Sequence, residues 1–293
     1  MLDFRVATFL TVCKTLNFTR AADELNLTQP AVTQHIHFLE KYYGVKLFRY
    51  DKKVLYLTDE GKILYERLNS IRKDEDEIKN ELRFKKDIFP LISFGVTMTI
   101  GEYAIIEPIA SFISSHPEIN IHIRYGNTYD LLKMLDDGII SFALIEGYYP
   151  EEKYGHCKYM TDDFICICSS NHVFSRKKPY NLKDLINEKL ILREKGSGTR
   201  NILERCLASR GMGISQFKSF IQAENMHTIV NLVENDCGIA FLYKIAANES
   251  LKKGYIREIK LSDFSMKHNF DFVWDKNSIY ADITLEFAKK LMS

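Results

Sequence analysis

The sequence lacks the patterns that mark several large classes of protein. Its six cysteines form no Cys-x-x-Cys pair, and no histidines accompany them at the spacing of a zinc site. No apolar run reaches the length of a membrane span, and the first residues, with Asp3 and Arg5, do not read as a secretory signal. We therefore expect a cytoplasmic protein with reduced thiols, no metal, no cofactor and no membrane partner. A redox-sensing cysteine pair is the alternative for the thiols.

Enzyme signatures are also missing. Ser197, His227 and Cys237 are the candidates for a nucleophile or base, but no Ser–His–Asp or Cys–His motif surrounds them. The short run Gly196–Thr199 has no P-loop lysine. We expect the protein not to be an enzyme. A solute-binding protein of the transport type is the other rival, and the absence of an export signal and the basic amino-terminal segment argue against it.

Charge is present but unevenly distributed. The 293 residues carry a net charge of +1, and their apolar content of 46% is enough for two or three domains with real cores. Residues 1–58 hold eight basic and five acidic side chains, a net charge of +3, which leaves −2 for the remainder. A positive amino-terminal segment on a near-neutral body is typical of a DNA-binding unit attached to something else.

Residues 18–43 contain the pattern of two short helices separated by a tight turn. Thr28 is expected to cap the second helix, and Pro30 lies in its first turn. Apolar residues recur in that helix at spacings of four, three and four: Val32, Ile36, Leu39 and Tyr43. The opposite face presents Gln29 and Gln34, whose amides can pair with the edge of adenine. The pattern predicts a helix-turn-helix that reads DNA, and an ordinary helical hairpin is the alternative.

A small β-hairpin is expected next. Two short apolar–polar strands, Lys46–Arg49 and Val54–Leu57, flank a basic tip at Asp51-Lys52-Lys53. A winged helix-turn-helix places such a tip against phosphates or in the minor groove. A solvated loop without a DNA contact is the alternative for the tip.

A long helix with a narrow apolar seam follows the hairpin. Thr58 is expected to cap it, and the seam follows the four–three rhythm of a heptad with interruptions at Gly61 and Glu75. A narrow seam buries too little by itself, so we expect the helix to pair with a second copy and to set the separation of two recognition helices. The expected dimerisation residues are Leu64, Leu68, Ile71, Ile78 and Leu82. A helix that lies on its own domain is the alternative.

From Leu91 the sequence alternates between strands and helices. Three strands separated by two helices, the first helix expected over Glu102–Ser115, predict a parallel sheet with helices on its faces. A second unit of similar texture follows and returns to the first near the end of the chain. The expected domains are 1–58 for DNA binding, 59–87 for the linker helix and 88–293 for the body, with lobe I over about 88–161 and 267–293 and lobe II over about 162–266.

Six segments carry a resemblance to a known family. They are FTRAADELNLTQPAVTQHIHFLE, GVKLFRY and LTDEGK near the amino terminus, and GNTYDLLKMLDDGIISFALIEG, ILREKGSGTR and VENDCGIAFLY in the body. Together they resemble a LysR-type transcriptional regulator over the whole chain, and REKGSGTR resembles the branch that includes regulators of sulfur assimilation and carbon fixation. Two positions depart from the family pattern, because Gln34 stands where Arg or His is usual and His37 where a basic residue is usual.

The resemblance implies an α/β protein with an amino-terminal winged helix-turn-helix, a long linker helix and a two-lobed effector domain like a periplasmic binding protein. It implies double-stranded promoter DNA, a small-molecule co-inducer and RNA polymerase as partners, and a homodimer through the linker helix within a homotetramer. The residues expected to contact DNA are Thr19, Arg20, Thr28, Gln29, Pro30, Ala31, Thr33, Gln34, His35, Lys52 and Lys53.

Three segments at the carboxyl ends of expected strands are candidates for the effector site. Residues 97–99, 127–128 and 196–199 offer hydroxyls or free backbone N–H groups, which suit an anion. We expect a small anionic effector between the lobes, either an inorganic oxyanion or an organic carboxylate, with Arg193 or Arg200 adding charge. The expected effector residues are Thr97, Met98, Thr99, Asn127, Thr128, Arg193, Ser197, Gly198 and Thr199.

Each of these segments also has a purely structural interpretation. Thr97, Thr99 and the Gly196–Thr199 run could serve only as helix caps, and Asn225 is expected to cap a helix rather than line the site. If an effector does prefer one arrangement of the lobes, its binding biases the oligomer and changes the spacing of the DNA-binding units.

Overall fold

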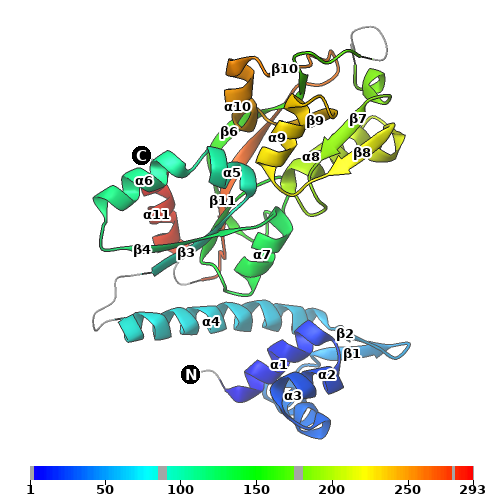
Figure 1. Ribbon diagram of the computed structural model, residues 1–293. Coiled ribbons are helices and arrows are strands. Elements are labelled where there is room, and N and C mark those ends of the chain that lie inside the picture. Colours follow the sequence, from blue (N-terminus) through cyan, green and yellow to red (C-terminus); the bar gives the residue numbers. More distant parts are fainter. Residues whose placement is uncertain (1–2, 85–90, 175–180, 279–280, 293) are drawn as a thin grey trace. The chain divides into compact units, whose positions relative to one another are not determined.

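The computed structural model separates into two units (Figure 1). Residues 1–88 with 277–280 form the first unit, and residues 89–276 with 281–293 form the second. The parts of the chain described by the structure are 3–84, 91–174, 181–278 and 281–292. The boundary expected between residues 87 and 88 lies outside these described residues. Within them, no helix has both the length and the apolar character that crossing a membrane requires.

The first unit contains three short helices, a hairpin and a long helix. Its elements are α1 (Phe4–Thr15), α2 (Phe18–Leu25), α3 (Gln29–Tyr43), β1 (Phe48–Asp51), β2 (Val54–Leu57) and α4 (Asp59–Phe84). The side chains of Asp3, Asn17 and Thr28 accept hydrogen bonds from the first-turn N–H groups of α1, α2 and α3. Pro30 lies in the first turn of α3, and Gly44, with φ of +72°, ends it. The predicted helix-turn-helix is confirmed.

One core joins the three short helices to the hairpin and to the start of α4. The predicted apolar stripe of α3 faces this core at Val32, Ile36 and Leu39, but Tyr43 is 42% exposed because the helix ends there. Gly61 interrupts the seam of α4 for a steric reason, since a Cβ atom there would lie 2.2 Å from the backbone oxygen of Leu47. The buried core residues are Val6, Phe9, Leu10, Val12, Cys13, Ala21, Ala22, Val32, Ile36, Leu39, Leu47, Leu55 and Leu68.

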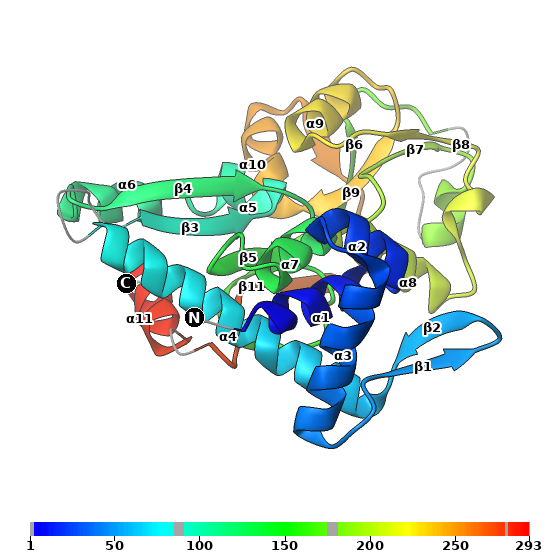
Figure 2. The ribbon, with the colours of Figure 1, turned by 90° about the horizontal axis from the view of Figure 1, so that it is seen from below.

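The hairpin turns over two residues. Asp51 pairs with Val54, so Lys52 and Lys53 form the turn, with φ angles of 45° and 68°. Two successive left-handed residues are what a tight hairpin turn needs to match the twist of its strands. The hairpin extends away from α1–α3 (Figure 2). The first strand begins two residues later than expected.

Glu40 connects α3 to the strand that follows it. Its buried carboxylate accepts hydrogen bonds from the Leu47 backbone N–H at 3.0 Å and the Lys46 Nζ at 2.6 Å, and His37 Nδ1 lies at 3.3 Å. Burial by itself would raise the pKa of Glu40, but these hydrogen bonds outweigh it and hold the pKa below its usual value of 4.5. The ionised carboxylate therefore stabilises this unit.

Replacing Glu40 with alanine is expected to destabilise the first unit by about 2 kcal/mol at pH 7, because the Leu47 N–H loses a charged acceptor. The folded-state pKa is depressed, so the contribution is present above about pH 4.5 and disappears as the pH falls through the folded-state value. Urea unfolding followed by circular dichroism at pH 7 and pH 4 measures both effects. Fluorescence of Trp274, the single tryptophan, reports the second unit separately. An equal loss in the exposed control Glu24→Ala would contradict the assignment.

The second unit is an α/β structure with one sheet of nine strands. Its elements are β3 (Leu91–Val96), α5 (Met98–Tyr103), α6 (Ile106–Ser115), β4 (Asn120–Tyr125), α7 (Thr128–Asp136), β5 (Phe142–Glu146), β6 (Gly155–Ser169), η1 (Leu182–Leu185), β7 (Lys189–Leu192), α8 (Gly198–Ala208), η2 (Ile214–Gln216), β8 (Ser219–Gln222), α9 (Met226–Glu234), β9 (Ile239–Tyr243), α10 (Lys244–Lys253), β10 (Ile256–Glu258), β11 (Met266–Trp274) and α11 (Ala281–Met292). The strand order is β4-β3-β5-β11-β6-β9-β7-β8, with β10 paired to β6.

The sheet has a parallel group in each lobe and two antiparallel strands that join them. In lobe I, β3 is parallel to β4 and β5, and in lobe II, β7 is parallel to β8 and β9. The long strands β6 and β11 pair with each other and run through both lobes. The limits expected near residues 161 and 267 therefore fall inside these strands. The parallel sheet predicted after Leu91 is confirmed for β3, β4 and β5. The carboxyl ends of β3, β5, β7 and β9 each lead into a segment near the lobe junction.

Helices cover the sheet in both lobes (Figure 1). In lobe I, α7 packs on β5, while α11 packs on β11 and α6; in lobe II, α9 packs on β6, β7 and β9. Two helices reach across the junction, because α8 contacts both β9 and β5, and α10 contacts both β9 and α5. The junction is therefore a packed part of this unit.

One helix prediction in the second unit was wrong, and one helix was not predicted. The single helix expected over Glu102–Ser115 is two helices, broken at Ala104 and Ile105. Pro108 cannot donate to the carbonyl of Ala104, which instead accepts from the Tyr159 hydroxyl at 2.9 Å. Helix α10 was not anticipated, because its buried face is made of small residues and gives a weak apolar pattern.

Candidate functional site

The helix-turn-helix presents the residues expected to contact DNA on its surface. Gln29 and Gln34 are exposed on α3, and Gln29 Nε2 donates to the Thr33 hydroxyl at 2.9 Å. Ala31 and Thr33 are half-buried. The other exposed members of the set are Thr19, Arg20, Thr28, Pro30, Lys52 and Lys53. The first unit therefore presents two amide side chains on α3 and a basic tip on its hairpin.

His35 lies apart from this surface. Its Nδ1 is 2.9 Å from the Thr8 hydroxyl, and its ring meets the ring of Phe4 edge-on with centroids 4.9 Å apart. Both partners belong to α1. The half-buried imidazole therefore packs between two helices of its own unit, and we leave it out of the proposed DNA surface.

The apolar seam of α4 is divided between two environments. Leu68 is buried in the core of the first unit, and Leu64 packs against that core. Ile71, Ile78 and Leu82 are exposed, at 49%, 40% and 65%. Their spacings of seven and four place them on one side of the helix. These three residues are called the exposed seam below.

Glu146 lies at the centre of the polar residues at the lobe junction. It ends β5, is 1% exposed, and its carboxylate accepts hydrogen bonds from the hydroxyls of Thr97 and Thr199, the latter at 3.3 Å. The Thr128 hydroxyl donates to its backbone oxygen at 2.7 Å. Three segments far apart in the chain therefore converge on one residue, and they are the segments expected to hold the effector.

Several buried polar atoms at the same junction have no hydrogen-bond partner among the described residues. They are the Thr99 hydroxyl, the Ser197 hydroxyl, Arg193 Nη1 and the Tyr243 hydroxyl. Arg193 is 3% exposed and directs its Nε and Nη2 atoms to Glu194 at 2.8 and 3.0 Å. Buried donors without a partner are uncommon and costly, so these atoms are candidates for contact with a ligand or ordered water.

The charge of the junction is mixed. Burial raises the pKa of Glu146, against the opposing effects of Thr97, the Arg193 charge and Thr199. Burial also raises the pKa of Glu102 on α5, and the charges of Arg193 and His227 oppose it. Arg193 thus lies within electrostatic range of two carboxylates in addition to its ion pair with Glu194.

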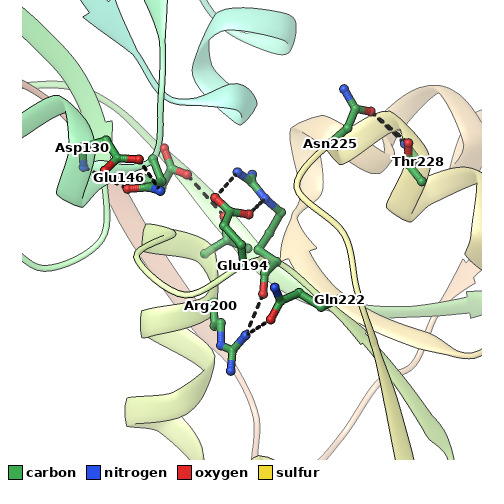
Figure 3. A network of polar contacts seen from close by, with 10 residues as sticks. Asp130, Glu146, Glu194, Arg200, Gln222, Asn225 and Thr228 are labelled. Carbon is green, nitrogen blue, oxygen red and sulfur yellow. Dashed lines mark hydrogen bonds and ion pairs between the residues drawn. The ribbon is translucent and has the colours of Figure 1, made fainter.

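Other polar residues of the expected site hold the backbone in place. Asn127 caps α7 by accepting from the Asp130 N–H at 2.9 Å, and Asn225 caps α9 by accepting from the Thr228 N–H at 2.9 Å. Arg200 donates to Glu204, to Gln222 and to the Arg193 backbone oxygen at 2.8, 2.9 and 3.1 Å. Figure 3 shows Asn225 and Thr228 set apart from Glu146 and Glu194. The cap expected at Asn225 is confirmed, and Arg200 supports the loop of Arg193.

Two residues at the junction, Glu146 and Tyr243, were not predicted from the sequence. Glu146 is the last residue of the buried strand FALIE, and Tyr243 is the last residue of β9. Both stand at strand carboxyl ends, where ligands bind in α/β sheets. The same rule that selected residues 97–99 and 127–128 would have selected them.

Two family models match most of the chain. Residues 5–62 match the model of the bacterial regulatory helix-turn-helix protein of the lysR family, and residues 90–285 match the model of the LysR substrate binding domain. The chain belongs to the LysR family. A LysR-family member is a DNA-binding transcriptional regulator with an effector-binding domain, and the resemblance found in the sequence is confirmed.

Individual relatives of this LysR-family regulator cover nearly its whole length. The regulator CysL of Bacillus subtilis (strain 168) is 28% identical over 267 residues, 91% of this chain and 88% of its own. A probable RuBisCO transcriptional regulator of Emiliania huxleyi is 26% identical over 291 residues, 97% of this chain and 93% of its own. These names agree with the branch indicated by REKGSGTR, and the relatives are named as transcriptional regulators, not as enzymes.

A solved structure supports the same fold. Full-length LysG of Corynebacterium glutamicum, with bound effector Arg, has a TM-score of 0.65 and 14% sequence identity, and the match covers 100% of this chain and 98% of that chain. In the described parts of this LysR-family regulator, no group of three or more His, Cys, Asp or Glu residues is placed to hold a metal. All six cysteines are free, and burial raises the pKa of Cys168 to about 11, which disfavours a reactive thiolate there.

Proposed function

We propose that this regulator reads promoter DNA with α3 and holds the duplex with its hairpin. The exposed amides of Gln29 and Gln34 enter the major groove, where a glutamine can bond adenine through two atoms. Lys52 and Lys53 at the hairpin tip contact phosphates. The family usually has a cation at the position of Gln34. The neutral amide weakens the attraction to phosphates and favours a hydrogen bond to a base.

The active form in this proposal is an oligomer. The exposed seam of Ile71, Ile78 and Leu82 packs against the same seam of a second copy, since an apolar heptad stripe on a long helix is what a coiled-coil pair buries. Two such dimers form a homotetramer that contacts RNA polymerase at its promoters. The protein acts where the DNA is, in the cytoplasm.

The effector in this proposal is a small molecule with an anionic group, bound at the lobe junction. The observation that carries this assignment is the set of buried, unpartnered atoms on Thr99, Ser197 and Arg193. Thr97, Met98, Thr128, Gly198 and Thr199 complete the wall, and Asn127 holds the start of α7. Binding there favours one arrangement of the two lobes and so changes the spacing of the DNA-binding units.

The test is a footprint on the DNA upstream of the regulator's own gene, with small effectors added in turn. The wild type should protect paired sites, and an effector of this junction should shift the protected pattern. A footprint that no added molecule changes would contradict the effector assignment, and no protected site would contradict the whole proposal.

Replacing Gln29 or Gln34 with alanine is expected to weaken specific binding by about 10- to 100-fold, because each lost base contact costs about 1–3 kcal/mol. Retention on heparin should stay unchanged. The double variant Lys52→Ala/Lys53→Ala should instead weaken binding to all sequences alike and lower the salt dependence by about two ions. Fluorescence anisotropy with the protected duplex measures both, and Lys41→Ala, exposed at the far end of α3, is the control. Unchanged sequence preference in both glutamine variants would place the base contacts elsewhere.

A further inference from the structure

The lobe junction holds buried side chains of both charges, which a purely anionic effector does not explain. Glu146 and Arg193 are 1% and 3% exposed. Each makes its hydrogen bonds elsewhere, Glu146 with Thr97 and Thr199 and Arg193 with Glu194. The junction therefore holds an ionisable acceptor and a cationic donor within electrostatic range of each other, with no hydrogen bond between them among the described residues.

The unpartnered donors at the junction favour a ligand that carries a hydrogen-bond acceptor. Glu194 occupies Nε and Nη2 of Arg193, and among the described residues nothing accepts from its Nη1 or pairs with the hydroxyls of Thr99 and Ser197. One guanidinium N–H and two hydroxyls that donate to the same ligand group suit a carboxylate. One end of the ligand is therefore an anion.

The carboxylates at the junction favour a ligand that also carries a hydrogen-bond donor. The Arg193 charge already faces three carboxylates, those of Glu194, Glu146 and Glu102. A ligand that brought only negative charge would add an anion to a buried site that already holds the carboxyl groups of Glu146 and Glu102 beside a guanidinium paired with Glu194, at a desolvation cost. A positive group beside Glu146 would offset the cost of burying that carboxylate. The Tyr243 hydroxyl, unpartnered and within electrostatic range of Glu146, can accept from the same group.

We propose that the effector is a zwitterion of the α-amino-acid type, with its carboxylate on Arg193, Thr99 and Ser197 and its ammonium group on Glu146. This inference rests on the proposed effector site and names the class of molecule that the site takes. Glu146 then determines specificity: it admits a molecule that carries an amine and rejects the same molecule without one. Inorganic oxyanions and simple carboxylic acids are the molecules it rejects.

The test uses calorimetry on the full-length protein with the twenty standard amino acids. For each amino acid that binds, its deaminated acid, its carboxamide, and inorganic sulfate and phosphate are titrated as well. The wild type should bind the zwitterion about 30-fold or more tightly than either truncated form, because each leaves one buried charge unpaired. In Glu146→Gln the zwitterion should bind about tenfold or more weakly, while the deaminated acid binds as well as before or better. Glu107→Gln, an exposed carboxylate on α6, is the control and should change nothing.

The outcomes separate this inference from the proposed function. If a deaminated acid or sulfate binds the wild type as tightly as any amino acid, the zwitterion class is wrong and the effector site stands. The class is equally wrong if no amino acid binds while another small molecule shifts the footprint. If Glu146→Gln does not fold, the comparison of zwitterion, acid and carboxamide on the wild type decides the matter alone. A footprint that responds to nothing overturns the effector site itself.

Discussion

Replacing Gly198 with alanine is expected to destabilise the effector-binding unit by about 3 kcal/mol and to abolish its response to effector. A Cβ atom at Gly198 would lie 2.1 Å from the backbone oxygen of Glu146 and 2.8 Å from the Thr128 hydroxyl. The backbone oxygen cannot retreat freely, because Thr128 bonds it at 2.7 Å and Gly147, with φ of +97°, follows it. The first turn of α8 must then move away, taking Ser197 and Thr199 with it.

Urea unfolding followed by Trp274 fluorescence measures this effect, because Trp274 is on β11 of the same unit. Gly213→Ala is the matched control, since the nearest atom to a Cβ there is the Ser215 hydroxyl oxygen at 3.9 Å and no positive φ is involved. Gly198→Ala with the urea midpoint and effector affinity of the wild type would mean that α8 does not hold the site.

Introducing aspartate at both Ile71 and Ile78 is expected to make the protein monomeric and to weaken its binding to the paired promoter site by about 100-fold or more. Both side chains are exposed on α4 and belong to the proposed pairing seam. In the pair, the two aspartates of one helix would be buried against those of the other helix. Burying these like charges costs more free energy than the apolar contact gains. A monomer also loses the gain in affinity that comes from linking two recognition helices.

Sedimentation at micromolar concentration and anisotropy on a single half-site separate these effects. Half-site binding should stay close to that of the wild type, because Ile71 and Ile78 lie outside the buried core of the DNA-binding unit. The conservative pair Ile71→Leu/Ile78→Leu keeps an apolar seam and should remain a dimer. A wild type that sediments as a monomer, or an aspartate variant that stays dimeric, would remove α4 as the pairing element.

Predictions that depend only on neighbouring residues were confirmed at the start and end of α3. The Thr28 cap, the Pro30 first turn and the Gly44 stop each depend on neighbours a few residues away, and each is found where the sequence predicts it. Local spacing does not reveal contacts with partners distant in the chain. Leu68 belongs to a seam by its spacing, but the tertiary structure buries it in the core of its own unit. His35 belongs to the polar face of α3, but Thr8 and Phe4 hold it against α1.

The amino-acid sequence by itself determined the winged helix-turn-helix, the long linker helix and the alternation of strands and helices, since hydrogen bonds within a turn and apolar periodicity are local properties of the chain. It also located the hydroxyl-bearing segments that meet at Glu146 and that we propose as the effector site. Only the tertiary structure decided that Glu146 would stand among them and that Arg193 would keep one donor free. The electrostatic balance of a buried site depends on groups that folding brings close together. At this junction they come from positions about 50 residues apart in the chain. Local sequence patterns do not show how close such groups lie in space.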